Sequence, residues 1–202
     1  MNRGVWSALA LAGVACLFSQ SATAQSGPPA GAALNQFVPG RDAQGRYLTP
    51  NVDLSRDETS WHVRAALNVA ALGCRDEAER ETVAAYNHLL ARNHAVLAAA
   101  DAGVKAQYRA RYGARWEGLH DRDMTRVYNF FAQPPAQPGF CATAHQLLAE
   151  ADMVAPQEFA AFAQRALPRL EQSFTDFYRD YDAWRQANRG RQGGEGTLAL
   201  RR

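Results

Sequence analysis

Apolar residues recur at helical spacing through most of this chain, and this periodicity is the feature that most restricts its fold. The clearest seam has a period near 3.5 and consists of Phe159, Ala163, Ala166, Leu170, Phe174, Phe177, Tyr181 and Trp184. No stretch shows the convincing alternation of a half-buried strand. The pattern therefore predicts an all-α protein, a single-domain bundle of about five helices with an extended N-terminal arm.

The expected helices cover about residues 55–72, 76–112, 121–132, 138 onward and 156–187. The first begins with Ser55 and Glu58 at capping-box spacing, and Gly73 suits the left-handed conformation that ends a helix. Gly103 is a candidate break in the second helix. Pro168 should kink or split the last one.

The chain divides into four segments by composition. Residues 1–24 resemble a secretory signal peptide, with Arg3, an apolar run and a small-x-small cleavage site at Ala22–Ala24. Residues 25–54 form an arm rich in Gly, Pro and Ala, residues 55–187 the helical domain, and residues 188–202 a flexible Arg/Gly-rich tail. No later segment approaches the roughly 20 apolar residues that a membrane span needs.

The predicted export and the net charge of the chain limit the cellular location and the partners that we expect. The single lysine among 22 basic residues, with abundant alanine, is typical of GC-rich bacterial coding. We therefore expect a periplasmic protein; secretion, or a lipid anchor on Cys16, is the alternative. Loss of Arg3 with the signal lowers the net charge from +2 to +1. Such a weak field argues against nucleic acid as a partner.

Two cysteines, Cys74 and Cys141, remain after signal removal. In an oxidising compartment the simplest prediction is one disulfide between them. Cys141 also lies four residues before His145, one helical turn, which leaves a thiol–imidazole pair or half a metal site as the alternative. The prolines between Gln133 and Gly139 should form an elbow that this disulfide staples.

Polar residues fall on the apolar stripes of two expected helices. Asn87, His94 and Asp101 are spaced by seven residues in the second helix, and Asn68 shares a face with apolar residues in the first. We expect these four residues to form an interior polar seam. Such a seam either fixes helix register through hydrogen bonds or lines a ligand pocket.

The segment Gly118–Asp123 places His120 beside Asp121 and Asp123. These side chains are candidates for binding a cation or for acid–base work, and either aspartate could instead cap the third helix. The segment resembles the G-x-H-x-x-E motif of the imelysin-like periplasmic proteins, with Asp123 in place of the glutamate. We expect His62, in the first helix, at or near the surface.

The residues show no serine-triad, phosphate-loop, dinucleotide, haem-attachment or EF-hand signature. We therefore predict an exported envelope protein that acts as a non-catalytic binding or structural module, without a cofactor or metal. Its partner would be an envelope protein or a small ligand. The alternative is a small-molecule- or metal-binding protein, or an enzyme, that uses the polar seam or the His120 region.

Overall fold

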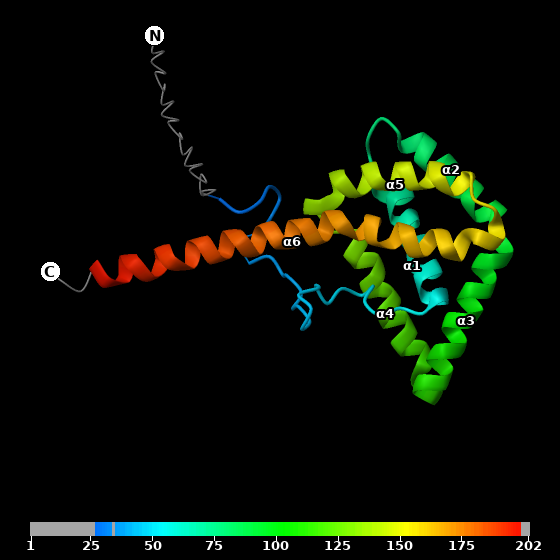
Figure 1. Ribbon diagram of the computed structural model, residues 1–202, viewed down its shortest axis with the longest axis horizontal. Coiled ribbons are helices and arrows are strands. Elements are labelled where there is room, and N and C mark those ends of the chain that lie inside the picture. The colour runs from blue at the N-terminus through cyan, green and yellow to red at the C-terminus, as the bar shows by residue number, and fades with distance from the viewer. Residues whose placement is uncertain (1–26, 34, 199–202) are drawn as a thin grey trace, which may run out of the picture.

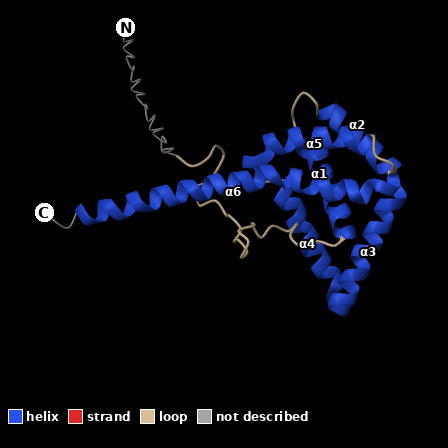
Figure 2. Ribbon diagram, in the orientation of Figure 1, coloured by secondary structure: helices blue, strands red, loops and turns tan. Residues whose placement is uncertain are grey.

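The computed structural model describes residues 27–33 and 35–198, with side chains described up to Asn188. Within these residues the protein is all-α, as predicted, and its helices pack as a bundle (Figures 1 and 2). The α-helices are α1 (Arg56–Gly73), α2 (Glu79–Arg92), α3 (His94–Tyr112), α4 (Trp116–Phe131), α5 (Gln137–Asp152) and α6 (Phe159–Leu198). The proposed signal segment lies outside the described residues. None of the described helices has the length and apolarity to cross a membrane.

Helix α1 occupies the middle of the bundle and packs against each of the other five α-helices. Its buried face consists largely of small side chains, and Val63, Ala66 and Ala70 are fully buried. The capping box is present: Ser55 Oγ accepts from the Glu58 amide, and the Glu58 carboxylate accepts from the Ser55 amide. This cap fixes the start of α1, where the site described below is built.

The predicted long second helix is two helices, which meet at Asn93 rather than at Gly103. The buried Asn93 side chain donates to the Leu89 carbonyl over 3.0 Å, a local bond that competes with regular helix. Gly103 has another role inside α3. A Cβ there would come within 2.0 Å of Asp57 Oδ2 on α1, so glycine allows the two helices to approach.

Three further boundaries differ from expectation. Gly73 is still helical in α1, and Cys74 caps that helix in an extended conformation. A glycine with positive φ does follow α3, where Gly113 is the C-cap. Helix α4 starts at Trp116, earlier than expected. Helix α6 continues through Pro168 without splitting and reaches Leu198, beyond the expected end near Ala187 (Figure 1).

The predicted disulfide between Cys74 and Cys141 is present, with a Cα–Cα distance of 5.8 Å. It joins the end of α1 to the first turns of α5, next to the proline elbow. The elbow is the short 3-10 helix η2 (Pro134–Ala136). Phe130, near the end of α4, is buried and its ring lies 4.7 Å from that of Phe174 on α6. The elbow is thus a packed structural joint.

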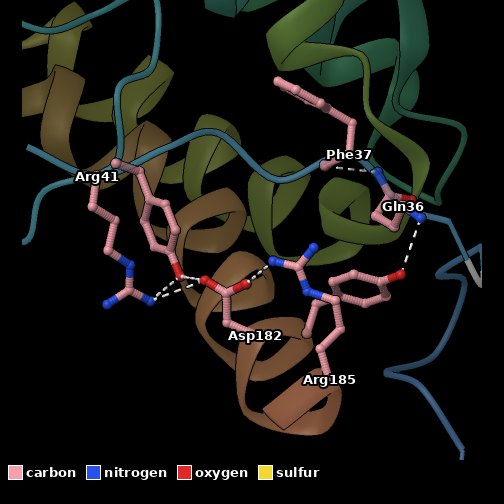
Figure 3. Close-up of polar contacts among 7 residues, drawn as sticks. Gln36, Phe37, Arg41, Asp182 and Arg185 are labelled. Atoms are coloured by element: carbon pink, nitrogen blue, oxygen red, sulfur yellow. Dashed lines mark hydrogen bonds and ion pairs between the residues drawn. The ribbon is translucent and has the colours of Figure 1, made fainter. Parts of the chain in front are cut away.

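The N-terminal arm lies along α6, where polar contacts hold it (Figure 3). Tyr47 donates to Asp182 Oδ2 over 3.0 Å, and Arg41 forms an ion pair with the same oxygen at 3.2 Å. The backbone N–H of Gln36 donates to the Tyr181 hydroxyl over 3.0 Å. The ring of Tyr47 meets that of Tyr178 edge to face. These contacts bring residues 47–51 against α6 and α1.

Candidate functional site

The prediction that four polar residues form a seam inside the bundle is wrong about where these residues lie. Asn87 and His94 are exposed, and Asp101 and Asn68 are half-buried. The seven-residue spacing assumed one continuous helix, whereas the break at Asn93 starts a new helix. The residues that α2 and α3 bury are instead Tyr86, Leu89, Leu97, Ala100, Val104 and Tyr108, with Thr82.

Asp101 and the His120 region, which the sequence offered separately, lie in the same surface hollow. This Trp61 hollow has a volume of about 450 Å³ and is lined by Trp61, Asp101, Trp116, His120, Asp121 and Tyr128, among others. A smaller hollow beside it contains His94 and shares Trp61 and Asp101. Tertiary packing of α1, α3 and α4 therefore joins two of the candidate regions, while Asn87 and Asn68 line neither hollow.

The remaining candidates have defined partners. Asp123 accepts from the Tyr108 hydroxyl over 3.2 Å and pairs with Arg122 at 3.0 Å. It lies inside α4, so it does not cap that helix. His145 Nε2 lies 3.7 Å from Asp76 Oδ1. Because Cys141 is in the disulfide, a thiol–imidazole pair with His145 is excluded.

The most unusual polar arrangement is one that we did not predict, a buried chain of hydrogen bonds from α6 through the arm to α1. Glu171 accepts from Thr49 over 2.5 Å and from the Asn51 amide over 3.0 Å. Asn51 Oδ1 lies 2.8 Å from His62 Nδ1. Since the Asn51 amide nitrogen faces Glu171, its oxygen must accept, and His62 carries its proton on Nδ1. Nε2 is then the free acceptor of the ring.

Burial changes the protonation of both ends of this chain. Desolvation lowers the pKa of His62 to about 4, against a small opposing effect of Glu58, so the imidazole is neutral at pH 7. Desolvation also raises the pKa of Glu171, and the hydrogen bonds from Thr49 and Asn51 offset it only in part. No ion pair joins Glu171 to a cation among the described residues. A carboxylate buried without a cation costs stability and is uncommon.

His62 and Thr49 also line a second hollow, the His62 hollow, between the arm, α1, α3 and α4. Its volume is about 230 Å³, and its wall includes Thr49, Glu58, His62, Tyr108, Asp123 and Arg126. Burial, followed by the nearby Asp123 carboxylate, raises the pKa of Tyr108 to about 12, so its hydroxyl stays a donor. The hollow thus presents a neutral imidazole, two hydroxyls and charges of both signs.

Sequence reasoning missed this network for two reasons. His62 was expected near the surface, but it is 4% exposed. Glu171 went unnoticed although a signal existed, because Leu167, Glu171, Phe174 and Tyr178 share one helical face and the other three are buried. The contribution of Thr49 and Asn51 depends on where the arm lies. Nothing in the arm's composition indicated that.

Two further questions about the site are whether it could hold a metal ion and whether the chain resembles known proteins. In the described part of the chain no cluster of three or more His, Cys, Asp or Glu side chains is arranged to hold a metal ion. The six-residue likeness to the imelysin-like motif, at Gly118–Asp123, is not accompanied by a family match. No protein-family model, no curated protein and no solved structure matches this chain.

Proposed function

We propose that this protein is an exported module of the bacterial cell envelope that binds a small polar ligand in the His62 hollow. The observation that carries the proposal is the buried chain from Glu171 through Asn51 to His62, which ends at the wall of that hollow. A perturbed titratable group beside a cleft is a recognised mark of a functional site. The disulfide and the secretory pattern of residues 1–24 support the periplasmic location.

The hollow indicates the size and polarity of the ligand. A volume of about 230 Å³ lies below the roughly 300–1,000 Å³ of drug-sized sites, which favours a small metabolite. Arg122 and Arg126 oppose Glu58 and Asp123 in its wall, so the lining has no net formal charge. His62 would accept a hydrogen bond through Nε2, and the Tyr108 hydroxyl, whose proton goes to Asp123, would accept another. We therefore expect an uncharged or zwitterionic ligand rich in hydroxyl or amide groups.

A thermal-shift panel of amino acids, monosaccharides and small amides on the mature protein tests the ligand. At least one member should raise the melting temperature saturably, and His62→Gln should abolish this effect. The matched control is His94→Gln, which changes an exposed histidine of α3 outside the His62 hollow. Equal responses of the two variants, or no response to the whole panel, would contradict the proposal.

Localisation needs its own experiment. The full chain should be expressed in a bacterium, and the periplasmic fraction examined by intact-mass measurement. We expect a chain that begins at Gln25 and carries no free thiol. A chain found in the cytoplasm with residues 1–24 retained would contradict export, independently of ligand binding.

A further inference from the structure

The Trp61 hollow, which shares only Met124 with the lining of the His62 hollow, combines aromatic rings with carboxylates. Trp61 comes from α1, Trp116 and Tyr128 from α4, and Asp101 from α3. From these residues we propose that the Trp61 hollow binds an organic cation, a quaternary or protonated amine with apolar substituents. Aromatic faces attract such cations through the ring quadrupole, and quaternary ammonium groups lose little hydration on binding.

The two tryptophan rings already bind cations of the chain itself. The Arg64 guanidinium lies over Trp61, 5.0 Å from the ring centroid, and the Arg109 guanidinium lies over Trp116 at 4.2 Å. Both rings line the hollow. Arg64 also donates a 2.7 Å hydrogen bond to the hydroxyl of Tyr128, another residue of the lining, which fixes this guanidinium beside the hollow. The chemistry that attracts cations to these rings is therefore visible in the structure.

Charge in the hollow favours a cation over an anion. Asp101 pairs with Lys105 at 2.7 Å, so these two charges offset each other. Glu117 has no ion pair among the described residues, and Asp121 Oδ1 lies 3.5 Å from His120 Nδ1. Among the residues that line the hollow, Glu117 and Asp121 thus leave an excess of negative charge, while Arg64 and Arg109, outside the lining, add positive charge next to its tryptophan rings. Both carboxylates are exposed, so their attraction is weak and screened by salt.

His120 supplies a second, independent observation at the same place. Its Nε2 atom is buried and has no hydrogen-bond partner among the described residues. Buried polar atoms are normally paired, and an exception calls for an explanation. Because His120 is also part of the lining, this unpaired nitrogen belongs to the same wall as the rings and carboxylates. The hollow thus offers aromatic contact and negative charge to a single ligand.

The experiment is a titration of the mature protein with choline, followed by tryptophan fluorescence, with 3,3-dimethylbutan-1-ol as the uncharged isostere. Choline should bind saturably, with a Kd on the order of 1 mM, and the isostere far more weakly. Trp116→Leu should weaken choline binding roughly 2- to 30-fold, the range of a cation–π contact. Equal binding of choline and the isostere, or no saturable change with choline, would overturn the proposal.

Two further variants separate binding from folding. Glu117→Gln combined with Asp121→Asn changes only exposed carboxylates, so it should weaken choline binding without changing the circular dichroism or melting temperature. His62→Gln, which alters the other hollow, should leave choline affinity unchanged. Both proteins should be compared in low salt. If the double variant then binds choline with the affinity of wild type, the charge argument is wrong.

A quaternary ammonium group can be free or can belong to a lipid headgroup. Co-sedimentation with phosphatidylcholine vesicles, set against phosphatidylglycerol vesicles, distinguishes these sources. Sedimentation with phosphatidylcholine alone, competed by free choline, would assign the headgroup. Binding of choline without sedimentation would assign a free cation. Preference for phosphatidylglycerol would overturn the assignment of this hollow to cations.

Discussion

Glu171 in α6 accepts a hydrogen bond from the side-chain amide of Asn51, over 3.0 Å and across 120 residues of sequence. The same carboxylate oxygen accepts from the Thr49 hydroxyl. One half-buried acidic group on the longest described helix thus fixes two residues of the arm, and through Asn51 it orients His62 on α1. The arm is therefore a structural part of the His62 hollow.

Substitutions of Glu171 should separate its charge from its hydrogen bonds. Glu171→Gln keeps an acceptor oxygen and removes the charge, so its free energy of unfolding at pH 7 should equal or exceed that of wild type. Glu171→Ala leaves Thr49 and Asn51 without an acceptor and should lower this free energy by about 1–3 kcal/mol. Urea unfolding of the three proteins checks this. An equal loss in both variants would show that only packing matters.

The pH dependence of Glu171 follows from the direction of its shift. Its pKa is raised above 4.5 in the folded state, so the folded state holds this proton more tightly. Wild type should lose stability relative to Glu171→Gln as the pH rises from about 4.5 through the folded pKa. Unfolding free energies measured at intervals from pH 4 to 8 give the difference. A constant difference would contradict the raised pKa.

His62 should give a pH dependence of opposite sign. Its pKa falls from 6.5 to about 4 on folding, so the unfolded state binds the proton more tightly. Stability should therefore fall by about 3 kcal/mol as the pH decreases from 6.5 to 4. His62→Gln should remove this slope, as measured by urea unfolding at several pH values. An imidazole NMR titration with a midpoint near 6.5 in folded protein would refute the prediction.

Asn93, at the junction of α2 and α3, and Asn87, within α2, are a matched pair that tests how much a buried polar side chain contributes to stability. The Asn93 side chain is buried and donates to the Leu89 carbonyl, whereas Asn87 is exposed. Asn93→Ala should lower the free energy of unfolding by about 1 kcal/mol, and Asn87→Ala should change it by less than about 0.5 kcal/mol. Thermal and urea unfolding compare the two. Similar effects would mean that the junction does not depend on the Asn93 bond.

Removal of the disulfide by a Cys74→Ala, Cys141→Ala double substitution should lower stability by up to about 4 kcal/mol, on the loop-entropy estimate. Both cysteines are in the disulfide, so the mature wild-type protein should resist alkylation even in denaturant and should react only after reduction. Intact mass after alkylation, with urea unfolding of both proteins, measures the two effects. Unchanged stability in the double variant would show that packing of α1 against α5 suffices.

Local patterns were enough to predict much of the architecture. The helical periodicity, the capping box at Ser55 and the two cysteines led to an all-α bundle with a Cys74–Cys141 disulfide, and the structure confirms each. These features depend on residues close in sequence, or on a single pairing choice. The interior seam failed because it required one helix through Asn93, and helix breaks of that kind depend on which side chains become buried.

The sequence by itself determined the fold class, the cap of α1, the disulfide and the residues of the α6 seam, because period and spacing are local properties of the chain. Tertiary structure alone decided that Thr49 and Asn51 contact Glu171, and that Asp101 and His120 line the same hollow. Such contacts join segments up to 122 residues apart. Their energy comes from desolvation and hydrogen bonding inside the packed bundle, and no local pattern encodes where those groups come together.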